Sequence, residues 1–326
     1  MLQALPLDIK VKRTERRIEE WISYHGLDKC YLSFSGGIDS VVLLHIIKKR
    51  MNINIDTVFA NTRQERMEIV NFIKTLPGIT WIKPNMDIKE IITQYGYPVL
   101  SKETSLKIYK LRNYNLDPKY RNYLLNGDER GKYGKLAEKY KYLLNADFMI
   151  SNICCKKLKK DTFRNYEKKN KKIAPITGEL ADEGQSRTDE YLRFGCNAFN
   201  RKSGFKSTPL AFWTKNDILQ YVCENKLEYA SCYGEIVIDS YKTLPSGKKI
   251  PNYKTTKESR TGCVACAFGV QFEKSDNNRF IRYKQDNPKH YEYIMGGGKY
   301  NDKGLWVPSE KGLGFNHVLN YLGIPH

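Results

Sequence analysis

The sequence predicts an α/β fold: a doubly wound parallel sheet with a helical insertion and a loop-rich C-terminal region that carries cysteines. Two observations lead to this prediction. Between residues 29 and 95, short apolar runs alternate with amphipathic stretches of helical period, which is typical of a parallel sheet built from βαβ units. A long charged segment then interrupts the alternation, which returns near residue 173. The 326 residues are enough to bury a substantial core.

The predicted elements follow from hydrophobic periodicity and from turn residues. The chain starts with a basic amphipathic helix over about residues 8–27. The predicted strands are 30–34, 53–59, 79–82, 173–178 and 235–238. The predicted helices after the first are 41–49, 64–76, 87–95, 214–225 (capped by Thr214) and 276–295. We expect an irregular tail after the glycines at 296–298.

The charge of the chain is large and unevenly distributed. The formal net charge is +19, and the segment 101–172 holds 20 Lys plus Arg against 8 Asp plus Glu, or +12 of that total. Eight tyrosines are interleaved between Tyr109 and Tyr166. Basic residues with aromatics can follow a phosphate backbone and stack on bases, which predicts a tRNA or DNA partner. The alternative is a composition bias towards Lys, Asn, Ile and Tyr without any selection for binding.

The expected location is the cytoplasm, without a membrane partner. No apolar run reaches the roughly 18 residues that span a bilayer. The start of the sequence lacks a basic region followed by a long apolar one, so we expect no secretory signal.

A serine- and glycine-rich loop follows the first predicted strand and precedes a helix. Glycines let backbone N–H groups turn towards an anion, and the helix adds its positive N-terminal end. Asp39 is the candidate ligand of a Mg²⁺ ion that bridges phosphate oxygens. The alternative is a flexible turn with an ordinary helix cap. The candidate phosphate-binding residues are Ser33, Ser35, Gly36, Gly37, Asp39 and Ser40.

This loop resembles the pyrophosphate-binding motif of the ATP pyrophosphatase and PAPS reductase superfamily, whose members share an adenine nucleotide alpha-hydrolase fold. The resemblance implies an adenine nucleotide, ATP or a relative, at the loop. It extends loosely to about residue 266 and adds Asn61 and Glu183 as candidate nucleotide-binding residues. Asn61 departs from the family's Asp, and Leu180 stands where the family has an arginine, whereas Arg187 matches. A solvated ion pair is the alternative for Glu183 and Arg187.

Two cysteine pairs form a candidate metal centre. Cys154 and Cys155 are adjacent, and Cys263 and Cys266 have Cys-x-x-Cys spacing. Four soft ligands suit an iron-sulfur cluster or zinc. The arrangement resembles the 4Fe-4S ligation of assimilatory APS reductases, and cluster-bearing relatives include enzymes that insert sulfur into tRNA or DNA. The resemblance therefore favours a 4Fe-4S cluster, with zinc as the alternative.

These features predict three segments: an N-terminal helix (1–28), a nucleotide-binding α/β domain (29–225) with a basic helical insertion at about 101–172, and a loop-rich region (226–326) with the Cys-x-x-Cys. The expected function is that of an iron-sulfur sulfurtransferase of ATP pyrophosphatase type. It adenylates a substrate, such as tRNA or DNA, for sulfur transfer from a sulfur-donor protein. The candidate catalytic residues are Asp39, Lys102 and Arg187.

Two alternatives stay open. One is an APS or PAPS reductase relative, although such reductases carry a mobile nucleophilic cysteine near the C-terminus and no cysteine follows Cys266. Its nucleophile would then come from another protein or from Cys196. The other is a non-catalytic nucleotide-binding subunit of a modification or defence system.

Overall fold

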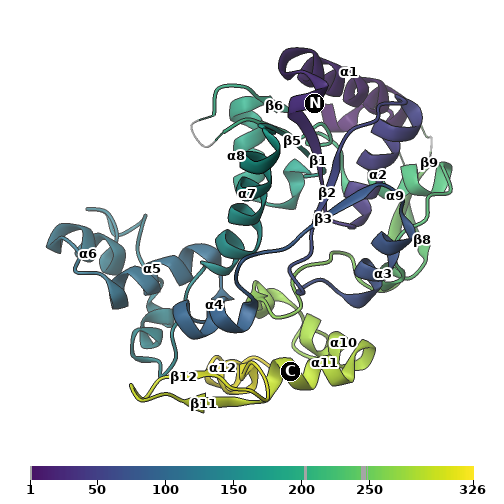
Figure 1. The fold of residues 1–326 in the computed structure, drawn as a ribbon. Coiled ribbons are helices and arrows are strands. Elements are labelled where there is room, and N and C mark those ends of the chain that lie inside the picture. Colours follow the sequence, from purple (N-terminus) through teal and green to yellow (C-terminus); the bar gives the residue numbers. More distant parts are fainter. Residues whose placement is uncertain (1, 202–203, 244–246, 248) are drawn as a thin grey trace. The chain divides into compact units, whose positions relative to one another are not determined.

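The computed structural model describes residues 2–201, 204–243, 247 and 249–326, and it contains two compact units (Figure 1). Unit 1 comprises Met1–Asn61, Glu65–Lys83 and Thr162–Gly262. Unit 2 comprises Thr62–Gln64, Pro84–Asp161 and Cys263–His326. The units cut across the three expected segments, because most of the basic insertion shares a core with the last 64 residues.

Unit 1 is built on a six-stranded sheet in the order β3-β2-β1-β5-β7-β6. All neighbouring strands are parallel except β6 and β7, which are antiparallel. The predicted parallel sheet is therefore confirmed. Its strands are β1 (Cys30–Phe34), β2 (Thr57–Ala60), β3 (Ile79–Ile82), β5 (Ala174–Thr177), β6 (Asn197–Ala198) and β7 (Lys206–Ser207).

Helices cover both faces of this sheet, as a doubly wound fold requires. Side chains alternate across a strand, so Leu32 of β1 joins the main core of unit 1 while the neighbouring Tyr31 points to the other face. There Tyr31 packs against Tyr166 of α7, with ring centroids 5.4 Å apart. The helices that contribute to unit 1 are α1 (Leu7–His25), α2 (Ile38–His45), α3 (Met67–Thr75), α7 (Asp161–Asn170), α8 (Gln185–Phe194) and α9 (Lys215–Glu224).

A buried ion pair joins α1 to α9. Lys10 Nζ lies 2.5 Å from Asp217 Oδ2, with side-chain exposures of 1% and 12%. The same carboxylate accepts hydrogen bonds from the backbone N–H and the hydroxyl of Thr214, the predicted helix cap. Trp213 Nε1 donates to Thr14 of α1 at 2.9 Å. Polar groups and apolar packing thus fix α1 on the core together.

We expect Asp217→Ala to lower the free energy of unfolding by about 3–5 kcal/mol, because it leaves the buried Lys10 ammonium without a counter-charge and with only the Gln3 carbonyl as acceptor. Urea denaturation measures this change. Asp189→Ala, at an exposed site on α8, is the matched control and is expected to stay within about 0.5 kcal/mol of the wild type. Equal stability of the two variants would contradict this account of α1.

Unit 2 has its own core, formed by helices and short strand pairs. β4 (Val99–Leu100) pairs in parallel with β10 (Ala267–Phe268), and β11 (Gly298–Tyr300) pairs antiparallel with β12 (Trp306–Pro308). Its helices are α4 (Ile88–Tyr95), α5 (Lys102–Asn113), α6 (Pro118–Asn126), α10 (Arg279–Asp286), α11 (Pro288–Met295) and α12 (Phe315–Tyr321).

Two C-terminal predictions were wrong. The single helix predicted over 276–295 is two helices, because Asn287 leaves the helical conformation (φ −141°, ψ 66°) and Pro288 starts α11 without an N–H donor. The tail expected to be irregular contains β11, β12 and the helix α12, which buries Phe315, Val318 and Leu319.

The remaining elements are short. The strand predicted at 235–238 is the start of a hairpin in unit 1, β8 (Ile236–Thr243) and β9 (Lys249–Thr255). The 3₁₀ segments are Leu2–Ala4, Leu27–Lys29, Glu138–Asn145, Ala181–Glu183, Ser231–Tyr233 and Val270–Phe272, and the π-helical turns are Ile46–Arg50 and Lys156–Lys160. In the described part of the chain, no helix combines the length and apolarity needed to cross a bilayer.

Candidate functional site

The serine- and glycine-rich loop lies at the switch point of the unit 1 sheet. β1 is flanked by β2 on one side and by β5 on the other. The chain runs from β1 to β2 and β3 on one side of β1 and later adds β5 on the other side, so the strand order reverses at β1. In open α/β sheets, ligands bind at the carboxyl ends of the strands at such a point. The loop follows the carboxyl end of β1, and Gly178 follows the carboxyl end of β5. The topology therefore places the predicted phosphate loop where this fold class holds ligands.

The conformation of the loop depends on Gly36. Its φ of +72° is in the left-handed region, and a Cβ there would lie 2.6 Å from Ile73 Cδ1 and 2.8 Å from Ile69 Cγ2 of α3. Glycine is thus required both by the backbone angle and by the close approach of α3. Gly37 then caps α2 in an extended conformation.

We expect Gly36→Ala to destabilise unit 1 by about 1–3 kcal/mol, from the strained φ and the contact with α3. Gly262→Ala is the control, because a Cβ at Gly262 meets no atom within 4 Å and its φ is not in the left-handed region. The measurement is urea denaturation of both variants. If Gly36→Ala were as stable as the control, the loop would not need the observed conformation.

Hydroxyl groups organise the loop and leave amides available for a ligand. Ser35 Oγ accepts from Gly37 N–H at 3.2 Å and donates to Ser40 Oγ at 3.1 Å, and Ser40 Oγ donates to the Gly37 carbonyl at 2.7 Å. The N–H groups of Gly36, Asp39 and Ser40 donate no hydrogen bond to another described residue. Such amides at a helix N-terminus suit a phosphate.

Asp39 lies in the first turn of α2 and is paired with a residue that the sequence prediction did not include. Lys215 Nζ of α9 donates to Asp39 Oδ1 at 3.0 Å, and both side chains are partly exposed. Asp182 is close enough to matter electrostatically: burial raises the pKa of Asp182, and the Asp39 carboxylate adds to the rise. Two carboxylates and one ammonium therefore surround the start of α2.

Two further residues at the loop, Tyr233 and Thr261, were also missed. Tyr233, from a distant 3₁₀ turn, accepts from Ile38 N–H at 3.2 Å, and its hydroxyl is 3.0 Å from Thr261 Oγ1. A Cβ at Gly178 would lie 3.1 Å from Ser40 N, so the loop after β5 touches the start of α2. No local pattern marks Tyr233 or Thr261, since their role arises only from the tertiary fold.

Glu183 and Arg187 form an ion pair, which matches the alternative interpretation of these two residues. Glu183 also accepts from the Leu180 N–H at 3.1 Å and pairs with Arg260 at 3.2 Å. Burial alone would raise the pKa of Glu179, but Lys206 and Arg187 outweigh burial and lower it. The region after β5 is thus a network of mutually neutralising charges.

The other predicted site residues lie in different places. Ser33 is inside β1, opposite Val58 and Thr177. Asn61 follows β2 at the same sheet edge as the loop, and its N–H donates to the Ile82 carbonyl. Lys102 belongs to unit 2, where it starts α5; a hydrogen bond with Cys154 is the main cause that lowers the pKa of Cys155, and the charge of Lys102 adds to it.

The backbone of unit 2 brings the two cysteine pairs together. The Ser151 N–H, just before Cys154, donates to the Tyr97 carbonyl at 3.1 Å. Ala267, just after Cys266, pairs with Val99, and its N–H donates to the Pro98 carbonyl at 3.1 Å. The segment that leads to Cys154 and Cys155 therefore lies beside Tyr97, and the segment that follows Cys266 lies beside residues 98–100. Both cysteine pairs are thus held next to the same short stretch of chain.

The four thiols also affect one another electrostatically. A hydrogen bond between Cys154 and Cys155 raises the pKa of the buried Cys154 and lowers that of Cys155 to about 6. Burial raises the pKa of Cys266 to about 12, with added effects of Cys263 and Cys155. As the side chains stand, they do not form a site of three or more metal ligands among the described residues. The donor chemistry fits a thiophilic centre, since all cysteines of unit 2 gather here.

Cys196 does not have the surroundings of a nucleophile. It is buried, and burial raises the pKa of its thiol to about 12. A reactive cysteine is normally accessible and has a lowered pKa. Cys30 and Cys232 are also buried and have raised pKa values, as expected for structural thiols.

Three solved structures are similar to the chain at low identity. A phosphoadenylyl-sulfate (PAPS) reductase from Candida auris, in a phosphate complex, is 15% identical, with 67% of this chain and 82% of that chain covered and a TM-score of 0.40. A Candida glabrata FMN adenylyltransferase in complex with ATP is 12% identical over 72% and 63%, with a TM-score of 0.40. The U34-tRNA thiolase NcsA from Methanococcus maripaludis, with its [4Fe-4S] cluster, is 14% identical over 68% and 66%, with a TM-score of 0.34.

The sequence itself decides the family. No curated protein sequence matches the chain significantly. The phosphoadenosine phosphosulfate reductase domain, however, matches residues 29–98 and 102–267, well over half of the chain. This match spans the loop after β1, the region after β5 and both cysteine pairs. The chain therefore belongs to the phosphoadenosine phosphosulfate reductase domain family.

Proposed function

We propose that the chain is an enzyme of ATP pyrophosphatase type that adenylates a nucleic acid, tRNA or DNA, for sulfur transfer. The observation that carries the proposal is the loop at the switch point of the sheet. It has three backbone amides without a described partner, a glycine in a conformation that other residues avoid, and a carboxylate in the first turn of α2. These are the groups that bind a nucleoside triphosphate with its metal ion.

In this proposal the amides of the loop bind the β- and γ-phosphates, and Asp39 binds the Mg²⁺ that accompanies them. Lys215, now paired with Asp39, is placed to turn to a phosphate oxygen when the cation arrives. An oxygen of the acceptor then attacks the α-phosphorus, and the bond between this phosphorus and the bridging oxygen breaks. Pyrophosphate leaves, and the acceptor carries AMP. A sulfur nucleophile from a donor protein subsequently displaces AMP and takes the place of the acceptor oxygen.

The cysteines of unit 2 would hold a 4Fe-4S cluster through Cys154, Cys155, Cys263 and Cys266, with zinc as the alternative. When bound, such a cluster supplies a thiophilic metal site for sulfur chemistry. Lys102 contributes positive charge beside Cys155 and favours its thiolate form, which metal binding requires.

Exposed tyrosines among the cations of the basic segment in unit 2 support a nucleic-acid acceptor. Tyr114 and Tyr133 are more than half exposed, and Lys110 lies over the Tyr120 ring at 5.3 Å from its centroid. Tyr120 and Tyr123 stack with an interplanar angle of 17°. Exposed aromatics among cations bind single-stranded nucleic acid by stacking and by phosphate contacts.

Calorimetric titration with ATP, APS and PAPS, each with and without Mg²⁺, tests the nucleotide. We expect ATP with Mg²⁺ to bind at least about tenfold more tightly than either sulfonucleotide, which corresponds to about 1.4 kcal/mol. Tighter binding of APS or PAPS, together with sulfite release in the presence of a thiol donor, would support a reductase instead. Binding of no nucleotide would contradict the proposal.

A further inference from the structure

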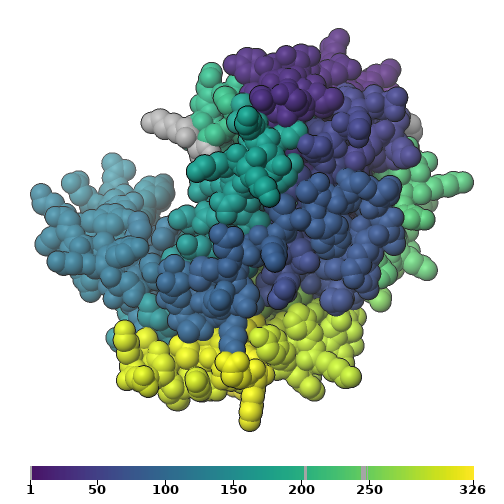
Figure 2. Space-filling view, viewed as in Figure 1, coloured from purple at the N-terminus to yellow at the C-terminus, as the bar shows by residue number. Residues whose placement is uncertain are grey.

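A stripe of basic residues on α1 faces away from the core of unit 1. Residues three and four apart share one side of a helix, so Lys12, Arg13, Arg16 and Arg17 lie on one face. All four are exposed. The opposite face is anchored in the core, where Ile18 and Trp21 are fully buried. The N-terminal segment that contains α1, purple in Figure 2, lies at the surface.

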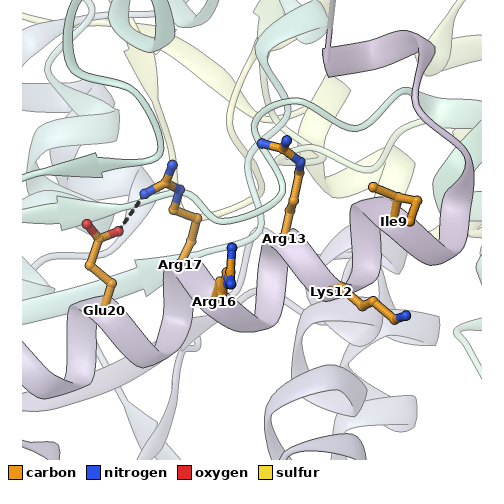
Figure 3. Close-up of a pocket in the computed structure, with 6 residues that line it drawn as sticks. All are labelled: Ile9, Lys12, Arg13, Arg16, Arg17 and Glu20. Carbon is orange, nitrogen blue, oxygen red and sulfur yellow. Dashed lines mark hydrogen bonds and ion pairs between the residues drawn. The ribbon is translucent and has the colours of Figure 1, made fainter.

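Most of this positive charge has no counter-charge. Arg17 pairs with Glu20 at 2.8 Å, as Figure 3 shows, whereas Lys12, Arg13 and Arg16 form no ion pair with a described residue. Like charges four residues apart, as in Lys12 and Arg16, destabilise a helix. Other charges of the same helix do have partners outside it, since Glu15 pairs with Arg50. The stripe is thus a cationic surface in which, among the described residues, only Arg17 has an ion-pair partner.

The stripe borders two adjoining cavities. The larger, about 650 Å³, is lined by Ile9, Lys12, Arg13, Arg16, Arg17 and Glu20 (Figure 3). The smaller, about 310 Å³, shares Arg13, Arg17 and Glu20 and adds an aromatic wall that includes Tyr191, Phe194 and Phe199. The arginines of α1 lie close enough to the aromatic wall to affect Tyr191. Burial raises the pKa of Tyr191, and the charges of Arg17 and Arg13 oppose this rise.

We infer that this groove binds a single-stranded stretch of nucleic acid, with phosphates along the α1 stripe and an unpaired base in the aromatic cavity. From Lys12 to Arg17 the helix rises about 7.5 Å, a span comparable with the separation of two neighbouring phosphates in an extended single strand. The aromatic wall supplies the stacking surface that distinguishes a nucleic acid from a simple anion. The inference rests on the proposed function only in taking the acceptor to be a nucleic acid.

A membrane surface fits the groove less well. A basic amphipathic helix binds membranes by inserting its apolar face, but in α1 that face is occupied by the core, with Trp21 donating to the Ala174 carbonyl. The cations are therefore available only to a ligand that stays outside the apolar phase.

Fluorescence anisotropy tests the inference. A labelled mixed-sequence single-stranded oligonucleotide is titrated with the protein at several salt concentrations between about 50 and about 300 mM, and no ATP is present. For Arg13→Gln combined with Arg16→Gln we expect about tenfold weaker binding near physiological salt and a salt slope that is shallower by about 1.4, because two phosphate contacts are lost at about 0.7 each. The matched control is Lys49→Gln combined with Lys74→Gln, two exposed cations elsewhere in unit 1. It is expected to keep the wild-type slope.

A second pair of variants tests the cavity. Tyr191→Ala is expected to weaken binding about tenfold without changing the salt slope, since stacking releases no counterions. Leu192→Ala, the exposed neighbour on α8, is expected to bind like the wild type. Equal slopes for the arginine variant and its control would overturn the inference, as would binding of anionic vesicles in preference to the oligonucleotide. Because ATP is absent, this result is independent of whether the chain turns over ATP.

Discussion

Replacing Asp39 with Asn is expected to lower ATP-dependent pyrophosphate release at least about 100-fold. Asp39 is the carboxylate in the first turn of α2, beside three amides that have no described partner. If it binds the Mg²⁺ of the nucleotide, its loss removes the charge that orients and neutralises the phosphates, and interactions of this kind contribute several kcal/mol to phosphoryl chemistry. An enzymatic pyrophosphate assay with purified wild type and variant measures the effect.

The control for this experiment is Asp8→Asn. Asp8 is likewise an aspartate in the first turn of a helix, α1, but it is exposed and lies outside the loop. Asp8→Asn is expected to keep wild-type turnover. This result would show that the loss of activity in Asp39→Asn is not a general effect of removing a charge from the first turn of a helix. Asp39→Asn with undiminished pyrophosphate release would show that Asp39 does not bind the metal.

Replacing Cys263 and Cys266 together with Ala is expected to remove the metal centre. The wild type, purified without oxygen, should contain about four irons and four acid-labile sulfides per chain. The double variant should contain none, because two thiols cannot hold a cluster that needs four. Metal analysis by plasma mass spectrometry and sulfide determination measure both. Zinc in place of iron would select the alternative metal.

The matched control here is Cys196→Ala combined with Cys223→Ala. Both cysteines belong to unit 1, so this variant loses two thiols but none of the four candidate ligands. It is expected to retain the full iron content. Equal iron content in the two double variants would rule out Cys263 and Cys266 as ligands, and wild-type protein without iron or zinc would rule out the centre.

Local patterns were sufficient to predict four of the six strands in the sheet of unit 1, whereas the two-residue strands β6 and β7 were not predicted. The strand 30–34 and the strand 79–82 are found at the predicted residues, because apolar runs bounded by turn residues mark strands directly, both in the buried β1 and in the partly exposed edge strand β3. Thr214 caps α9 as predicted, since a hydroxyl followed by Asp217 satisfies the first amides of a helix. These features depend on residues close together in the sequence.

Long-range features could not be predicted in the same way. Lys215 reaches Asp39 across 176 residues, and the Tyr233 hydroxyl binds the start of α2 across 195 residues. Only the packing of distant elements creates these contacts. The same holds for the core of unit 2, in which residues 84–161 and 263–326 are separated by most of unit 1.

The measurement that tests the central claim most directly is the identity of the products formed from ATP labelled at the α-phosphate, incubated with the chain, Mg²⁺ and a pool of tRNA or DNA. The account predicts label in AMP and transiently in the nucleic acid, with one pyrophosphate released for each AMP. Label in ADP with release of inorganic phosphate, or no ATP consumption with either nucleic acid and a sulfur donor present, would contradict it.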